Sequence, residues 1–230
     1  MFNLDSLIVF QNENWVVVDK PAMVLTTPSR FENEDDRMVM GRELEKKMQC
    51  QIFPVHRLDF EVSGLVIYAK NEKAHAAGNY WFENKLVNKT YRALSRHQDF
   101  SHIPENVKIK KEFFDPELQH QYEWRSRIFR GKKRSFDSPQ GKPSLTYATC
   151  INMENGIYQW NLEPLTGRPH QLRYEMSKHG YSIIGDELYG SKFKFNSEGI
   201  ALRAFQIELT EVPIEKRFGL LEQIKIDPIF

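Results

Sequence analysis

Two short segments of the chain bring together side chains that could perform chemistry. The first is His56-Arg57-Leu58-Asp59, which places an imidazole, a guanidinium and a carboxylate within four residues. The apolar run Gly64–Ala69 follows and predicts a buried strand, and loops held on rigid scaffolds commonly carry functional residues. The tetrapeptide alone fits a solvated Arg57–Asp59 pair equally well, so its role depends on a second element.

The second segment is GRPHQLR, the run from Gly167 to Arg173. It holds Arg168, His170 and Arg173 at a predicted passage from a strand into a helix. Guanidinium groups beside the N–H groups of a helix N-terminus favour an anion, either a phosphate or a carboxylate from another segment. Neither segment identifies a reaction by itself.

Taken together, the two segments and their surroundings resemble the RluA-type RNA pseudouridine synthases. VHRLDFEVSGLVIYAK, residues 55–70, is similar to the family signature HRLD-xx-SGL-xxxAK, and residues 167–190 are similar to its GR-x-HQ-[IL]-R and GD-x-YG motif. Further landmarks occur in the family's order, namely VVVDKPAMVLTTP, KTYRAL, GKPSLTY and ALRAFQIEL. The resemblance runs from about Leu7 to Leu209 and is specific as a set.

The resemblance implies an enzyme that isomerises uridine in RNA to pseudouridine with no metal ion or other cofactor. The family's carboxylate falls on Asp59, which would attack C1′ of the ribose or remove a proton from C2′ to form a glycal, and the sequence does not choose between these routes. Arg173 aligns with the arginine that pairs with this carboxylate, since a buried carboxylate needs a nearby cation to stay ionised. Whether Arg168 shares that role stays open. Tyr91 matches the tyrosine that stacks on the target uracil and can remove the C5 proton.

The resemblance also implies residues that contact the substrate. Leu202 corresponds to an apolar residue of the pocket, and Arg57 to a side chain that fills the gap left by the flipped nucleotide, whose extrusion costs a few kcal/mol. Arg168 and His170 join them, although we expect His170 to act mainly as a structural hydrogen-bonding residue.

Four positions depart from the family pattern. Glu175 stands where the family commonly has His, and a carboxylate beside an RNA surface would be locally unfavourable. The other departures are Val62 for Thr, Pro169 for Thr or Ser, and Arg203 for His. None of them removes the nucleophile, its cation or the tyrosine.

Charge is concentrated in one stretch. The 32 Lys and Arg residues nearly balance the 31 Asp and Glu residues, so the net charge is +1 and any nucleic-acid surface must be local. Six of the ten residues from Arg125 to Arg134 are basic, and Gly, Ser and Pro in the stretch through Pro143 predict a loop. We expect this loop to bind RNA phosphates beside the target nucleotide through Arg130, Lys132, Lys133 and Arg134, and its alternative role is a solvated surface.

Many strands, few helices and no regular alternation between them predict the α+β class with a largely antiparallel sheet. The expected strands are 7–10, 15–18, 64–70, 89–94, 106–111, 145–149, 158–162 and 201–209, and the expected helices are 38–48, 72–86 and 171–178. The chain then ends in a mostly polar tail. The resemblance makes this the pseudouridine synthase fold, a mixed sheet with flanking helices and loops around a central cleft.

The composition and the position at which the family pattern begins indicate the cellular location and the number of domains. Two cysteines, Cys50 and Cys150, are too few for a disulfide framework, and no run of eighteen apolar residues occurs, so we expect a cytoplasmic protein with no membrane association. The family pattern starts by Leu7, which predicts a single catalytic domain over residues 1–230 without the N-terminal S4 RNA-binding module. We expect a monomer that acts on structured RNA, either rRNA or tRNA.

Two other functions are alternatives for this sequence. A non-catalytic RNA-binding or RNA-folding protein on the same fold is the main alternative, and the presence of Asp59, Tyr91 and Arg173 argues against it. A glycoside hydrolase would need a second carboxylic acid partner, and no paired acidic motif supports it.

Overall fold

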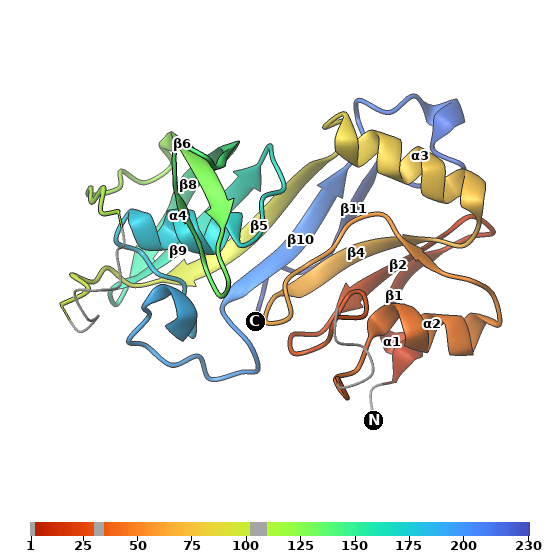
Figure 1. Ribbon diagram of the computed structural model, residues 1–230, viewed down its shortest axis with the longest axis horizontal. Helices are drawn as coiled ribbons and strands as arrows, with labels where there is room; N and C mark the ends of the chain where they lie inside the picture. Colours follow the sequence, from red (N-terminus) through yellow and green to blue (C-terminus); the bar gives the residue numbers. More distant parts are fainter. Residues whose placement is uncertain (1–2, 30–34, 102–109) are drawn as a thin grey trace. The chain divides into compact units, whose positions relative to one another are not determined.

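The computed structural model describes residues 3–29, 35–101 and 110–230 (Figure 1). The chain forms two compact units, one of Met1–Asn88 with Ala204–Asp227 and one of Lys89–Arg203 with Pro228–Phe230. We call them the first and second unit. The single catalytic domain over residues 1–230 stays a prediction.

The sheet of the first unit is built around strand β4 (Ser63–Ala69). Its strand order is β1-β2-β4-β10, with β3 added to β4 and β11 to β10, and the pairs β1/β2, β2/β4, β3/β4 and β10/β11 are antiparallel. The bounds of these strands are β1 Ile8–Gln11, β2 Trp15–Lys20, β3 Phe53–Pro54, β10 Leu202–Glu208 and β11 Gln223–Lys225. The turn from β1 to β2 is fixed by Asn12, whose Oδ1 accepts from the backbone N–H groups of Asn14 and Trp15, both at 2.8 Å.

Helices cover this sheet. α3 (Glu72–Glu83) is capped by Asn71, whose side chain accepts from the backbone N–H of Ala74 at 2.9 Å, and it buries Trp81 in the core beside Trp15. α2 (Met40–Met48) buries Met40 and Leu44, whereas Met38, where the helix was predicted to begin, lies before it and is exposed. α1 (Leu4–Leu7) and the 3-10 helix η3 (Ile214–Lys216) complete the helical elements described in this unit.

One expectation for the first unit was wrong. The segment after Leu209 was expected to be a polar tail, yet it adds β11, and Val212, Leu220 and Ile224 are buried in the core. These apolar residues are too widely spaced to form a visible strand pattern, and they gain order only by packing on a sheet that already exists.

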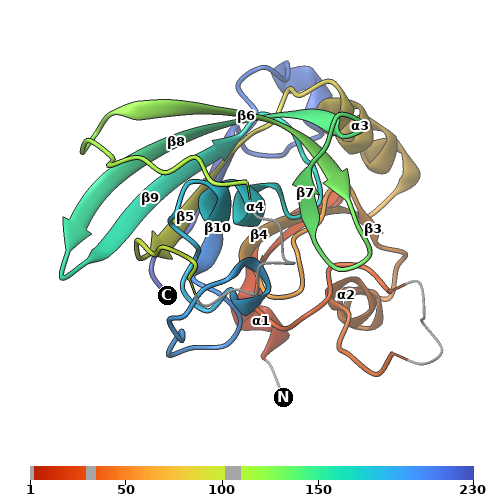
Figure 2. The same cartoon turned by 60° about the vertical axis from the view of Figure 1, so that its left-hand side comes forward.

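The second unit has a sheet of long strands, β5-β9-β8-β6-β7, in which every neighbouring pair is antiparallel (Figure 2). The bounds are β5 Asn88–Ser95, β6 Gln121–Arg130, β7 Ser135–Asp137, β8 Lys142–Glu154 and β9 Ile157–Pro164. α4 (Gln171–Lys178) and the 3-10 helix η2 (Glu187–Tyr189) follow. The helix predicted over 171–178 and the strands predicted over 89–94, 145–149 and 158–162 are confirmed.

The basic stretch is not the predicted loop. Its first half is the end of β6, where Trp124, Ser126 and Ile128 are buried and the intervening Arg125 and Arg127 are exposed. Only Gly131–Arg134 form a turn, after which β7 pairs back onto β6. The loop prediction failed because arginine on the solvent face of a half-buried strand looks like a charge run. The strand predicted over 106–111 lies for the most part outside the described residues.

In the parts of the chain that the structure describes, no helix is long and apolar enough to cross a membrane.

Candidate active site

The loop that carries Asp59 is tied down on both sides. Thr26 Oγ1 accepts from the backbone N–H of Leu58 at 3.2 Å and donates to the Leu58 carbonyl at 3.1 Å, and the N–H of Val62 donates to the Asp59 carbonyl at 3.2 Å. His56 Nε2 accepts from the backbone N–H of Ile67 at 3.0 Å, so this imidazole joins the loop to β4. The loop is therefore a rigid holder for the half-buried Asp59.

Gly64 adds a second constraint immediately after this loop. Its φ is +118°, and a Cβ built on it would lie 2.2 Å from the carbonyl oxygen of Ala204. Any side chain would push β10 away from β4, so the residue must be glycine for the sheet to close beside the Asp59 loop.

Lys20 is a residue of this site that the sequence did not single out. It is fully buried at the end of β2, and its Nζ donates to the carbonyls of Pro21 and Val24, both at 2.8 Å. Burial lowers the pKa of Lys20 to about 7, and the negative charges of Asp59, Glu61 and Asp19 act in the opposite direction. The feature of the sequence that could have pointed to Lys20 is the Asp-Lys-Pro run inside VVVDKPAMVLTTP. A cation therefore lies within electrostatic reach of Asp59 inside the first unit.

Arg173 is held at the start of α4 by a partner that the sequence did not predict. The guanidinium makes two hydrogen bonds to Asp186, Nε to Oδ2 at 2.7 Å and NH2 to Oδ1 at 2.8 Å, and it lies 5.4 Å from the ring centre of Tyr189. Arg173 and Asp186 are both buried. Asp186 belongs to the segment GDELYG of the second motif, and the sequence predicted no role for this aspartate. Asp59 belongs to the first unit, and its ion pair with Arg173 stays a prediction.

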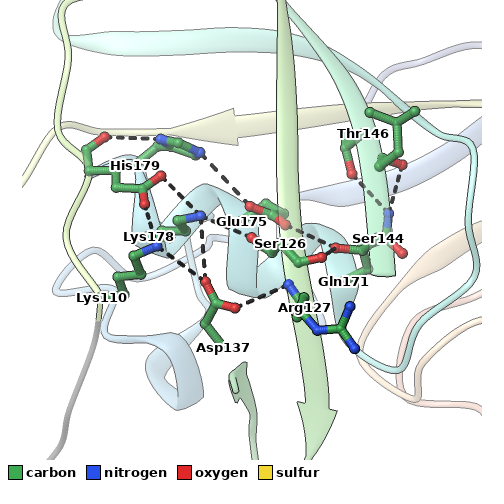
Figure 3. Close-up of polar contacts among 12 residues, drawn as sticks. Lys110, Ser126, Arg127, Asp137, Ser144, Thr146, Gln171, Glu175, Lys178 and His179 are labelled. Atoms are coloured by element: carbon green, nitrogen blue, oxygen red, sulfur yellow. Dashed lines mark hydrogen bonds and ion pairs between the residues drawn. The ribbon is translucent and has the colours of Figure 1, made fainter. Parts of the chain in front are cut away.

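The turn before α4 is organised by Gln171. Its Nε2 donates to the Leu145 carbonyl at 3.0 Å and to Thr146 Oγ1 at 2.9 Å (Figure 3), and its Oε1 accepts from Thr166 Oγ1 at 2.8 Å and from the backbone N–H of Arg168 at 3.0 Å. All four hydrogen-bonding positions of the amide are used. Gln171 therefore fixes the Gly167–His170 turn to strand β8, a role that the sequence reading did not assign.

Arg168 and His170 have local partners in this turn. Arg168 Nε donates to the Pro143 carbonyl at 2.9 Å. His170 Nδ1 lies 3.1 Å from the Tyr189 hydroxyl and 3.5 Å from Arg130 NH1, which brings two of the predicted substrate-contact residues together. These contacts agree with the structural role expected for His170.

Glu175 does not face an RNA surface, contrary to the expectation. It is fully buried under β6 and β8, where its Oε1 accepts from Ser144 at 3.4 Å (Figure 3). On the same helix, Lys178 Nζ donates to Ser126 Oγ at 2.9 Å and lies 3.0 Å from Glu112 Oε2. The carboxylate is tolerated because α4 turns its polar residues toward a buried polar network.

Burial in this network shifts two pKa values. It raises the pKa of Glu175 and lowers that of His179 to about 4. The imidazole Nδ1 lies 2.9 Å from the Glu112 carbonyl, which only accepts, so Nδ1 carries the proton and Nε2 faces Glu175 Oε2 at 3.8 Å. The network fixes α4, the helix that carries Arg173.

The remaining predicted residues differ in exposure. Tyr91 on β5 is 9% exposed and pairs with Leu162 of β9, and Leu202 is buried at the start of β10. Arg57 is exposed, as a side chain that enters a nucleotide stack would have to be.

The basic residues lie at the tip of the β6–β7 hairpin, with Lys132 and Lys133 exposed and Arg134 half-buried. Arg130 NH1 donates to the Lys133 carbonyl at 2.9 Å inside the turn. An open pocket of about 390 Å³ on the same hairpin contains none of the predicted site residues and includes the acidic Asp137 among its lining. Within the described ranges, no three His, Cys, Asp or Glu side chains are grouped as a metal site requires. The cofactor-free reaction stays a prediction.

Comparison with known proteins identifies the family. The family model for RNA pseudouridylate synthases matches residues 14–178, a span that includes the Asp59 loop, Tyr91 and Arg173. The chain therefore belongs to the RNA pseudouridylate synthase family, and it is of the RluA type that its motifs predicted. It is an RNA pseudouridine synthase, an isomerase that modifies RNA.

Two relatives and one solved structure support this family assignment. The chain is 32% identical over 207 residues to the dual-specificity RNA pseudouridine synthase RluA of Vibrio vulnificus (strain CMCP6), covering 87% of this chain and 76% of that protein. It is 28% identical over 190 residues to tRNA pseudouridine synthase C of the same strain, covering 80% and 73%. The structure of human RNA Pseudouridylate Synthase Domain Containing 1 matches with a TM-score of 0.70 at 23% identity over 97% of this chain and 84% of that one. This likeness confirms the predicted α+β fold.

Proposed function

We propose that this enzyme isomerises one or more uridines in a structured loop of rRNA or tRNA, with Asp59 as the reacting carboxylate. The observation that carries the proposal is the rigid HRLD loop within a family match that also spans Tyr91 and Arg173. The names of the relatives, a dual-specificity RNA pseudouridine synthase and a tRNA pseudouridine synthase, support RNA as the substrate, and the second name supports tRNA within the proposed class.

The reaction breaks the bond between N1 of uracil and C1′ of ribose and forms a bond from C5 to C1′. C5 then loses a proton and N1 gains one, so no electrons enter or leave. Asp59 attacks C1′ or removes the C2′ proton, and Arg173 stabilises its ionised form. Tyr91 stacks on the uracil and accepts the C5 proton.

Other residues hold the RNA. Arg57 occupies the gap left by the flipped nucleotide, and Leu202 lines the pocket. Phosphates beside the target are bound by basic side chains together with the turn before α4, namely Arg130, Lys132, Lys133, Arg134, Arg168 and His170. The enzyme needs no cofactor, works as a monomer and acts in the cytoplasm.

The decisive experiment maps pseudouridine across total RNA from cells with and without the gene. Sites that disappear in the deletion and return with the wild-type gene identify the substrate. The Asp59→Asn variant, which preserves side-chain volume, is expected to bind RNA but restore no site. Restoration by that variant would contradict the assignment of Asp59, and unchanged maps with retained RNA binding would favour the non-catalytic alternative.

A further inference from the structure

An exposed aromatic pair lies on the basic hairpin. Phe129 of β6 and Phe136 of β7 are directly opposite in the antiparallel register, and their ring centres are 5.5 Å apart with an angle of 49° between the planes. They are 40% and 41% exposed. Because the planes are tilted, neither ring covers the face of the other, and both keep aromatic surface in contact with solvent.

The pair is not needed for the core. β6 alternates, so Ile128 points inward to a small cluster with Tyr174 and Tyr189 while Phe129 points outward. Two neighbouring phenylalanines on the solvent face of a short hairpin cost hydrophobic free energy that an apolar ligand would recover.

The hairpin holds the pair in a fixed position. The turn closes with a hydrogen bond from the N–H of Gly131 to the carbonyl of Arg134 at 2.9 Å, and a Cβ on Gly131 would lie only 2.9 Å from Cε1 of Phe136. At the base of the turn, the N–H of Ser135 donates to the Tyr189 hydroxyl at 2.7 Å and its Oγ donates to the Pro169 carbonyl at 2.6 Å. The aromatic pair is thus connected to the segment that holds Arg173.

The charge around the pair selects the type of ligand. The exposed basic residues of the hairpin include Arg127, Arg130, Lys132 and Lys133. A ligand that offers both negative charge and flat apolar rings is a nucleic-acid strand whose bases are unpaired, since a duplex keeps the faces of its bases stacked inside.

We propose that Phe129 and Phe136 form a stacking platform for unpaired nucleobases next to the target uridine. This inference rests on the proposed function, because it takes a structured RNA loop as the substrate. The platform would select single-stranded or looped RNA, whereas the lysines and arginines bind any phosphate backbone.

The test compares the Phe129→Leu/Phe136→Leu double variant with the wild-type enzyme. Leucine keeps an apolar side chain but removes the ring. Binding is measured by fluorescence anisotropy with labelled oligoadenylate, oligouridylate and an RNA duplex of equal length. We expect about tenfold weaker binding of oligoadenylate, which corresponds to about 1.4 kcal/mol, a smaller loss for oligouridylate, and unchanged duplex binding and salt dependence.

Two further variants sharpen the test. Phe230→Leu is the matched control, because Phe230 is 42% exposed and its ring lies 5.6 Å from that of Phe195, outside the hairpin; it should bind all three RNAs like the wild type. Phe136→Trp keeps an aromatic face, so it should keep the affinity and add an emission signal that oligoadenylate quenches.

The outcomes separate this proposal from the proposed function. Wild-type affinity of the double leucine variant for oligoadenylate, or an equal loss of duplex binding, would overturn the platform while pseudouridine formation by the wild type still supports the function. Dissociation of a wild-type dimer by the double substitution would also overturn it, because the pair would then bind a second copy. A wild-type enzyme that neither binds nor modifies RNA would overturn both.

Discussion

Asp186→Asn tests how the second unit supports Arg173. The side chains of Arg173 and Asp186 are 2% and 1% exposed, and two hydrogen bonds of 2.7 and 2.8 Å join them. Solvent screens such a pair very little. Removing the negative charge takes away the carboxylate that accepts both of these hydrogen bonds from the buried guanidinium, so we expect the free energy of unfolding to fall, by about 3–5 kcal/mol at most.

Urea denaturation provides the assay, with tryptophan emission as the signal, since the four tryptophans are all buried and Trp124 and Trp160 lie in the second unit. The control is Glu43→Gln, which removes the ion pair with Lys46 on the surface of α2 and should change stability by about 1 kcal/mol at most. Replacing both members of the pair, with Arg173→Met and Asp186→Leu, should recover part of the stability because neither member of the pair then keeps a buried charge. Wild-type stability of Asp186→Asn would refute the reasoning. A stable but inactive double variant would assign Arg173 a role in the reaction.

Two more predictions concern RNA binding and pH. Replacing Lys132, Lys133 and Arg134 with Ala should make the negative slope of log K against log salt shallower by about two if all three contact phosphate, since each single-strand phosphate contact contributes about −0.7; an unchanged slope would make the hairpin tip a solvated surface. Burial lowers the pKa of His179 from 6.5 to about 4, so its contribution to stability is present above pH 6.5 and lost as the pH falls toward 4, by about 3 kcal/mol at most. His179→Asn can keep a donor near the Glu112 carbonyl but cannot titrate, and its stability should vary less over this range in parallel urea titrations. Burial raises the pKa of Glu175, which changes stability with pH in the opposite direction, but Glu175 is present in both proteins. Equal pH dependence of stability in the two proteins would contradict the prediction.

The order of strands and helices could largely be predicted from the sequence, because the apolar patterns that indicate them are local. Trp15–Val18 and Gly64–Ala69 are continuous apolar runs, as expected for strands buried on both faces. These local patterns gave wrong predictions where packing between distant segments determines the secondary structure. The β11 strand exists only because Ile224 finds a buried position beside β10, and β6 was hidden by the arginines on its outer face.

The sequence motifs predicted the candidate site residues, but they did not predict the contacts that support those residues. The sequence identified Arg173 and could not identify Asp186, because an acid thirteen residues away acquires its role only when the chain folds back. Glu175 was misplaced for a related reason: α4 is buried on all sides, so a polar residue on it gives no amphipathic pattern that reveals its direction. Lys20 lies just beyond the strand predicted over 15–18 and carried no signal of its own, although its burial near acidic groups shifts its pKa.

Tyr189 connects the two parts of the second unit that the proposals use, and Tyr189→Phe separates them. Its hydroxyl accepts from the buried N–H of Ser135 and lies 3.1 Å from His170 Nδ1, while its ring lies beside the Arg173 guanidinium. Phenylalanine keeps the ring and leaves the Ser135 N–H without its acceptor, at a cost of about 1–3 kcal/mol that weakens the anchoring of the hairpin. We therefore expect weaker RNA binding and a raised KM, with kcat close to the wild-type value because the Arg173–Asp186 pair is untouched. The matched variant Tyr122→Phe removes an exposed acceptor for the N–H of Glu117 elsewhere in the unit and should leave both constants unchanged. A fall in kcat with unchanged KM for Tyr189→Phe would mean that the hydroxyl serves Arg173 and the reacting carboxylate rather than the hairpin.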